Sequence, residues 1–364
     1  MVEALVDGKS ASLDAAVGRA AEILGAAKFP VVAGLGADVA GTSAAILLAE
    51  RLRGAYDHMR SPEILVDLAV FRQAGAMMTT PSVARLQADV LVFVGDDLSA
   101  IWPEAMARLA PGEIPYYDLQ KARRKVVWIG PPPGAKIEGA ELLAIEGADL
   151  RENVAALRAR VGKKPVATGG VALEALDAAA GVLNGARFGV MVWGPRLMDA
   201  LGVEMALGLL LDLNKTTRFT SLPLGAGDNA AGVTQTSGWS TGFPARTSFG
   251  RGYPEHDAWK FSADRLIEDG EADAALWVSA YSASAPRWTR RAPLVALTAQ
   301  ETAFSYPPKV EIRVGRPGLD HDGADYAREA AALVARTASA PSAAPSVAAV
   351  IGKIAAALPT QGEA

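Results

Sequence analysis

One pentapeptide has the spacing of a catalytic motif. Gly238-Trp239-Ser240-Thr241-Gly242 matches G-x-S-x-G, in which a serine on a sharp strand-to-helix turn is the nucleophile of α/β hydrolases. The flanking residues do not fit that role, because 234–237 (TQTS) is too polar for a buried strand and Pro244 would interrupt the following helix. We therefore interpret the motif as turn glycines around an ordered hydroxyl, and a self-contained serine hydrolase acting through Ser240 is the alternative hypothesis.

The pentapeptide lies inside a glycine-rich stretch, residues 225–256, which is predicted to be a long ordered loop. Neither the helical nor the strand period persists there, and seven glycines permit positive φ and close backbone approach. Asp228 and Asn229 add hydrogen-bonding groups, which suits an extended polar ligand or a partner protein. Arg246 and Arg251 could hold a carboxylate or phosphate, but pairing with Asp or Glu is the commoner outcome and the one we expect.

Two predicted strands end in residues that are typical of nucleotide-binding turns. Gly34-Leu35-Gly36 follows the first strand, yet Val39 stands where a dinucleotide fingerprint has its third glycine, so this is a tight turn with weak binding value. The predicted strand 90–95 ends in Gly95 and is followed by Asp96. A carboxylate at the carboxyl end of a parallel strand can bind a ligand, and it can equally cap the next helix.

The composition excludes several kinds of chemistry. The 364 residues contain no cysteine, so no thiolate nucleophile, disulfide or cysteine-bound iron–sulfur cluster can form. The three histidines, His58, His256 and His321, have no metal-binding spacing. A net charge of −4 with no basic stripe argues against nucleic acid, and no run of 18 apolar residues predicts a membrane span. We expect a cytoplasmic protein without a metal.

Alternating strands and helices predict an α/β fold of two Rossmann-like, doubly wound parallel sheets facing each other. We expect a first unit at residues 1–150, and a second unit at 151–330 that includes the loop 225–256. The segment 331–364 is predicted to be a linker followed by a docking helix. Strands are predicted at 29–34, 90–95, 126–130, 142–145, 188–194, 274–279, 293–298 and 310–314.

The C-terminal segment follows neither sheet pattern. Residues 337–346 (TASAPSAAPS) have too little apolar bulk to fold alone and are expected to reach away from the core. The following apolar stripe, Val347, Val350, Ile351, Ile354 and Leu358, predicts a short helix that needs a surface to cover it. It can pack on its own domain or on a neighbouring subunit. We favour the neighbouring subunit, and expect truncation after Thr337 to leave the chain folded.

Several segments together resemble the B subunit of formylmethanofuran dehydrogenase, in the molybdopterin oxidoreductase family. The resemblance covers most of residues 28–300. The resemblance rests on four segments: GLGADVAGTSAAILLAERLRGAYDH, SVARLQADVLVFVGDD, the whole stretch 225–256 with its RGYP, and FSADRLIEDGEADAALWVSA. It implies a pterin crevice between the two units in cofactor-bearing relatives. The residues expected to line what is left of that crevice are Gly34, Gly36, Gly95, Asp96, Asp228, Asn229, Gly232, Arg246 and Arg251.

The chain departs from that family where its redox chemistry resides. Cofactor-bearing members have an N-terminal cysteine-ligated cluster and a cysteine or selenocysteine, bound to tungsten or molybdenum, in the stretch written here as 56–62 (YDHMRSP). Without thiolates the resemblance implies no cofactor and no catalytic residues in this chain. It is more similar to the B subunits of bacterial formyltransferase/hydrolase complexes of methylotrophs. That similarity implies a structural role beside an amidohydrolase-type subunit, a formyltransferase subunit and a further small subunit. A crevice that still holds a small anion or the carrier tail is a further alternative.

Overall fold

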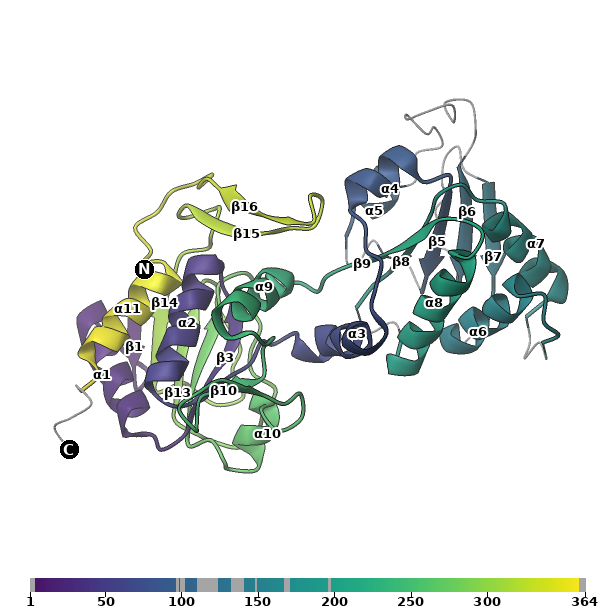
Figure 1. Ribbon diagram of the computed structural model, residues 1–364. Coiled ribbons are helices and arrows are strands. Elements are labelled where there is room, and N and C mark those ends of the chain that lie inside the picture. Colours follow the sequence, from purple (N-terminus) through teal and green to yellow (C-terminus); the bar gives the residue numbers. More distant parts are fainter. Residues whose placement is uncertain are drawn as a thin grey trace. The chain divides into compact units, whose positions relative to one another are not determined.

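The computed structural model describes residues 4–95, 98, 102–109, 124–131, 141–147, 149–166, 171–195 and 198–359 (Figure 1). The chain forms two compact units. Unit 1 comprises 1–61, 227–326 and 333–364, and unit 2 comprises 62–226 and 327–332. These bounds differ from the expected divisions after residues 150 and 330, because unit 1 is assembled from three separate stretches of chain. No helix of the described residues is long and apolar enough to cross a membrane.

The sheet of unit 1 is built around strands from both ends of the chain. Its order is β11-β10-β4-β3-β12-β13-β14-β1-β2, and β4, β3, β12, β13 and β14 run parallel to one another. Antiparallel strands extend both edges. The bounds are β11 Glu255–His256, β10 Thr247–Ser248, β4 Ala55–Tyr56, β3 Pro30–Gly36, β12 Ala274–Ser279, β13 Leu294–Thr298, β14 Val310–Arg313, β1 Ala4–Val6 and β2 Lys9–Ala11.

Helices cover both faces of this sheet, so it is doubly wound. One face carries α1 Leu13–Ala26, α2 Val39–Arg51, α9 Ala230–Thr241 and α11 Val347–Ala357, and the other carries α10 Ala263–Glu268. Every residue of β3 and β12 is buried, as expected of central parallel strands. Local signals agree with this arrangement: Ser12 caps α1 by accepting from Ala15 N–H, and Asp38 caps α2 by accepting from Gly41 N–H.

Unit 2 has a five-stranded parallel sheet in the order β7-β6-β5-β8-β9. Its strands are β5 Val90–Val94, β6 Lys125–Ile129, β7 Glu141–Ile145, β8 Gly189–Trp193 and β9 Phe219–Pro223. Its helices are α3 Ser61–Ala74, α4 Pro81–Gln87, α5 Ala105–Leu109, α6 Leu150–Val161, α7 Leu173–Asn184 and α8 Ala200–Leu213. Apolar clusters lie on both faces, so the expectation of α/β units with parallel sheets is confirmed. A separate pair of strands, β15 Gly323–Ala327 and β16 Ala332–Arg336, completes the described elements.

The prediction that 225–256 is one long loop is wrong in its middle, where α9 forms, and the stretch from Gly227 onward belongs to unit 1. Glycine, serine and threonine give α9 a poor intrinsic propensity. Tertiary packing overrides it: Gly232 and Thr236 are buried, and α9 packs against α2. Thr236 also donates its hydroxyl to Gly232 O, four residues back in the same helix.

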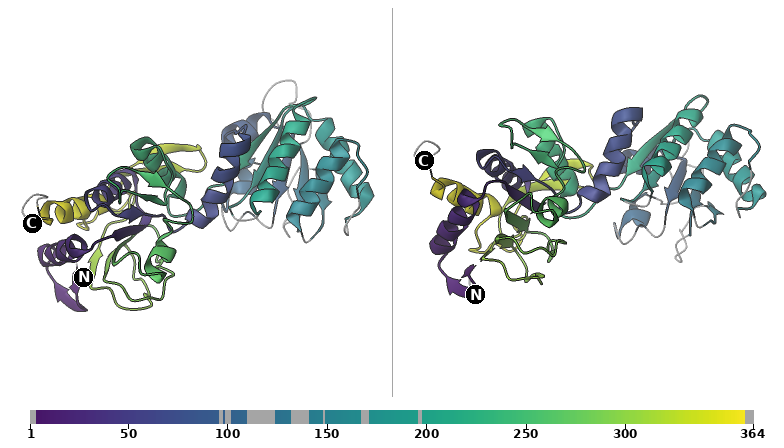
Figure 2. Two further views of the ribbon diagram at one scale, coloured as in Figure 1. Left: turned by 60° about the horizontal axis from the view of Figure 1, so that its bottom comes forward. Right: turned by 90° about the horizontal axis from the view of Figure 1, so that it is seen from below.

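The C-terminal segment folds onto unit 1, which corrects both expectations for it. Residues 337–346 follow the unit closely, with Ser339 N–H donating to Gly318 O and Gly315 N–H donating to Pro345 O. Helix α11 lies beside α1 and α2, and Figure 2 shows the yellow α11 next to these purple helices. Its apolar stripe is buried in the core of unit 1 and is therefore not free for a neighbouring subunit.

This packing predicts that α11 is needed for the stability of unit 1. Ile351→Ala removes a fully buried side chain and should lower the free energy of unfolding by about 2–4 kcal/mol, measured by urea unfolding. Lys353→Ala changes the same helix at an exposed ion pair and should cost less than about 0.5 kcal/mol. Equal, small effects of the two substitutions would show that α11 does not belong to the folded core.

Candidate functional site

The strongest candidate site lies at the carboxyl end of β3, where the strand order of unit 1 reverses. The chain continues from β3 to β4 on one side, whereas β12 on the other side leads to β13 and β14. Open α/β sheets bind ligands at such a reversal. The turns that follow β3, β4 and β12 meet the turn before α9 here. We use the name crevice cluster for the polar residues of these turns, which are Asp57, His58, Arg60, Asp228, Asn229 and Ser282.

The predicted glycines at this edge lie close to other parts of the same chain, so a side chain at these positions would have little space. A Cβ on Gly34 would lie 2.4 Å from Val278 O, and one on Gly36 would lie 3.1 Å from the Met59 side chain. A Cβ on Gly232 would meet the side chain of Asn229 at 2.2 Å. Gly95 is in unit 2, where its carbonyl accepts from Trp128 Nε1–H at 2.8 Å. Asp96 lies outside the described residues.

Asn229 connects three segments of unit 1. Asp228 and Asn229 both have positive φ, 55° and 58°, a conformation that Asp and Asn tolerate better than other non-glycine residues. The Asn229 side chain donates from Nδ2 to Ala37 O at 2.7 Å and accepts from Tyr326 N–H through Oδ1 at 2.9 Å. The Nδ2 group therefore holds the turn before α9 to the residue that follows β3, and Oδ1 holds the same turn to β15.

Asp228 is the centre of the crevice cluster. Its Oδ2 accepts from Arg60 Nε–H at 2.9 Å, and its Oδ1 accepts from Ser282 Oγ–H at 2.6 Å. Its carbonyl lies 3.0 Å from Nε2 of His58. Nδ1 of His58 accepts from Arg60 N–H at 2.9 Å, so a neutral ring protonated at Nε2 satisfies both contacts. Burial lowers the pKa of His58 to about 4, which keeps this ring neutral.

Asp57, directly after β4, is a buried carboxyl group with a raised pKa. Its side chain is 7% exposed, and Oδ2 accepts from Ala263 N–H at 2.9 Å with Arg246 Nε at 3.4 Å. Oδ1 is buried and has no hydrogen-bond partner among the residues that the structure describes. Burial raises the pKa of Asp57 to about 6, although the Arg246 guanidinium opposes the rise. Arg251 pairs with Glu255 at 3.2 Å on the surface.

The structure does not support a nucleophile at Ser240. The serine lies exposed in the last turn of α9 and is followed by Gly242, which ends the helix at φ 81°. A nucleophile elbow requires a strand-to-helix turn, so the serine hydrolase hypothesis is wrong in its structural premise. Among the described residues, no group of three or more His, Cys, Asp or Glu side chains could hold a metal ion.

Sequence reasoning selected Asp228, Asn229 and Arg246 but missed their partners His58, Arg60, Asp57 and Ser282. Asp57-His58 directly follows β4, and recognition of that two-residue strand would have placed both residues at a carboxyl edge. Ser282 was not recognisable, because its role depends on the pairing of β12 with β3.

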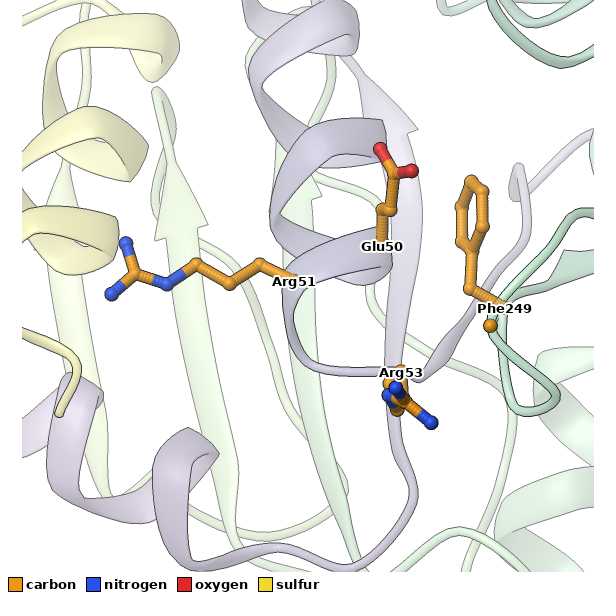
Figure 3. Close-up of a pocket in the computed structure, with 5 residues that line it drawn as sticks. Glu50, Arg51, Arg53 and Phe249 are labelled. Carbon is orange, nitrogen blue, oxygen red and sulfur yellow. The ribbon is translucent and has the colours of Figure 1, made fainter. Parts of the chain in front are cut away.

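A separate pocket of about 360 Å³ lies where α2 ends and β4 begins, lined by Glu50, Arg51, Arg53, Phe249 and Gly252 (Figure 3). Figure 3 shows Arg51 pointing away from it toward α11, where its guanidinium donates to Ala355 O and Leu358 O. None of the predicted site residues lines this pocket, so it does not correspond to the expected crevice.

The chain is similar in sequence to proteins of formyl metabolism. It is 36% identical over 325 residues to the B subunit of the formyltransferase/hydrolase complex Fhc of Methylorubrum extorquens, covering 88% of this chain and 87% of that protein. It is 24% identical over 337 residues to the B subunit of tungsten-containing formylmethanofuran dehydrogenase 2 of Methanococcus maripaludis, covering 88% and 77%. No family model matches the chain.

A solved structure is similar in fold. A chain in the crystal structure of the formyltransferase/hydrolase complex FhcABCD from Methylorubrum extorquens, determined with methylofuran, matches with a TM-score of 0.87 and 33% identity, over 96% of this chain and 97% of that one. Fold and sequence thus define an α/β protein related to the B subunits of formylmethanofuran dehydrogenases. The chain belongs to the family of the B subunits of formyltransferase/hydrolase complexes.

The pKa of Asp57 predicts a pH-dependent stability. Because the folded pKa lies above the unfolded value of 3.8, the stabilising contribution of protonated Asp57 is present below pH 4 and is lost as the pH rises through 6. The stability of Asp57→Asn relative to the unsubstituted protein should therefore increase by about 1–3 kcal/mol from pH 4 to pH 7.5 in urea unfolding. Asp177→Asn, at an exposed ion pair in unit 2, is the control. A pH-independent difference for Asp57→Asn would contradict the burial of an ionisable carboxyl.

The free energy of unfolding should depend on the backbone conformation of residue 229 as well as on the hydrogen bonds of its side chain. Asn229→Ala loses both bonds and places alanine at positive φ, and should cost about 2–4 kcal/mol of unfolding free energy. Asn229→Gly loses the same bonds without the strain and should be about 1 kcal/mol more stable than Asn229→Ala. If Asn229→Gly were as stable as the unsubstituted protein, the two hydrogen bonds would have no structural role.

Proposed function

We propose that the chain is a non-catalytic structural subunit of a formyltransferase/hydrolase complex, which takes formyl from tetrahydromethanopterin through a methanofuran-type carrier to formate. The observation that carries this proposal is the 36% identity over 88% of the chain to the B subunit of an Fhc complex, together with the 0.87 TM-score to a chain of the FhcABCD complex. Both relatives are components of one assembly, so the match supports a role within such an assembly.

The partners of this chain would be the other subunits of that complex. The family resemblance implies an amidohydrolase-type subunit for hydrolysis, a formyltransferase subunit for transfer and a further small subunit. In this arrangement the formyl chemistry takes place on the partner subunits, and the chain contributes a folded scaffold and surfaces for assembly.

The residues at the carboxyl edge of β3 do not fit a tungsten or molybdenum pterin. The chain has no cysteine thiolate, the soft ligand that the family resemblance implies for cofactor-bearing members. Both ring nitrogens of His58 are occupied by Arg60 N–H and Asp228 O, and both carboxylate oxygens of Asp228 are bonded within the protein. A cofactor here would have to break several of these buried bonds at once. We propose that the side chains of the crevice cluster fill this edge of the sheet in place of a cofactor.

Expression of the chain with the other subunits of its complex tests the proposal. The chain should purify as a stoichiometric component of an assembly that transfers and hydrolyses formyl groups, and elemental analysis should find tungsten and molybdenum far below one atom per chain. The isolated chain, analysed in the same way, is the control for metal binding outside the complex. Near-stoichiometric tungsten in either sample would contradict the proposal. The proposal would also be contradicted if the co-expressed chain purified without any of the other subunits.

A further inference from the structure

The pocket at the end of α2 is a concave site of unit 1 that does not include the crevice cluster. It lies where β4 begins, whereas the crevice cluster lies beyond the carboxyl ends of the strands. Its volume of about 360 Å³ falls within the range in which proteins bind small molecules, about 300–1,000 Å³. All five residues that line it belong to unit 1, and the function proposed above does not use them.

Backbone hydrogen bonds hold the walls of this pocket in place. At the end of α2, Arg53 N–H donates to Glu50 O at 3.0 Å. In the turn that follows β10, Gly252 N–H donates to Phe249 O at 2.7 Å. The two segments are joined to each other by Phe249 N–H, which donates to Gly54 O at 2.9 Å. The pocket is therefore formed by ordered backbone, and a ligand would not have to organise it.

Phe249 gives the pocket an apolar wall. The residue is only 3% exposed, and its ring centroid lies 6.0 Å from that of Tyr56. Figure 3 shows the ring of Phe249 beside the carboxylate of Glu50, with Arg53 below both in that view. A fixed aromatic ring next to charged groups suits a ligand that has an apolar part as well as charges.

Two opposite charges line the pocket without being used by the fold. Among the described residues, the Glu50 carboxylate and the Arg53 guanidinium form no hydrogen bond or ion pair, either with each other or with a third group. Arg51 differs, because its guanidinium donates to Ala355 O and Leu358 O. The pocket thus offers one carboxylate and one guanidinium to a ligand, and a guanidinium can hold a carboxylate through two parallel hydrogen bonds.

The sum of these charges decides which class of ligand fits. The end of a helix carries a partial negative charge, and the end of α2 contributes it here. Glu50 adds a full negative charge, so Arg53 alone does not make the pocket favourable for a phosphate dianion. A ligand that carries both a carboxylate and an ammonium group would satisfy both side chains at once.

We propose that this pocket binds a free α-amino acid with an apolar side chain. The carboxylate of the amino acid lies on Arg53, its ammonium group lies on Glu50, and its side chain packs against Phe249. This binding site is additional to the structural role proposed above, and neither depends on the other.

A ligand-observed NMR titration of the purified full-length chain tests the proposal. The probe is L-phenylalanine, compared with 3-phenylpropionate, which lacks the ammonium group, and with phenethylamine, which lacks the carboxylate. L-phenylalanine should bind with a Kd on the order of 0.1–1 mM, because exposed charges contribute modestly to binding. Each of the two analogues should bind at least about tenfold more weakly.

Two substitutions separate the two charges. Glu50→Gln should weaken the binding of L-phenylalanine about tenfold without weakening that of 3-phenylpropionate, whereas Arg53→Gly should weaken both about tenfold. Arg53→Gly should not lower the thermal midpoint of unfolding, because glycine adopts the positive φ of residue 53, 50°, without strain. The matched control is Lys163→Gly, which replaces another cation at positive φ, 55°, after α6 in unit 2. It should bind L-phenylalanine like the unsubstituted chain.

Several results would overturn the proposal. They are the absence of saturable L-phenylalanine binding below about 10 mM, equal binding by Arg53→Gly and the unsubstituted chain, and equal affinity for 3-phenylpropionate and L-phenylalanine. Tighter binding of inorganic phosphate than of L-phenylalanine would show an anion site and would also overturn it. None of these results bears on assembly with other subunits, so the proposed function would stand in each case.

Discussion

The pairing of β3 with β12 is the constraint on which the rest of unit 1 depends. It joins Pro30 to Ala274 and Val32 to Leu276, although unit 2 lies between them in the sequence. The two strands approach so closely at their carboxyl ends that Gly34 cannot carry a Cβ. The same pairing reverses the strand order beside β3 and brings the turns after β3, β4 and β12 together. The crevice cluster therefore depends on the strand order of the sheet as well as on the identity of its residues.

The crevice cluster shows how such an edge can be closed without a cofactor. Asp228 bonds to Arg60 and Ser282 through its carboxylate and to His58 through its carbonyl, while Asn229 bonds to Ala37 and Tyr326. A buried polar group is costly unless it is paired, and nearly all of these groups are paired with one another. Within the described part of the chain, Oδ1 of the neighbouring Asp57 is buried without a hydrogen-bond partner. An edge of this kind favours a role in holding the fold together.

The sequence was sufficient for features that depend on local patterns. Apolar runs such as 90–95 and 274–279 predicted the central strands β5 and β12. Three features depended on tertiary structure and were not predictable in this way. Helix α9 has weak local propensity and forms because it packs against α2. The three-part composition of unit 1 follows from a long-range strand pair. The apolar stripe of α11 predicted that this face of the helix would be buried. The stripe alone does not tell whether it is buried against the same chain or against a partner subunit.

The most direct test of the structural role is the turnover of the assembled complex when the crevice cluster is altered. His58→Gln and Asp228→Asn change groups that would have to act if this chain performed acid–base or ligand chemistry, while each retains part of the hydrogen bonding. If the chain is structural, rates of formyl transfer and hydrolysis per assembled complex should stay within about twofold of the unsubstituted complex at pH 7. A loss of more than about a hundredfold in either rate, with assembly intact, is the range expected for removal of a catalytic group and would contradict the account.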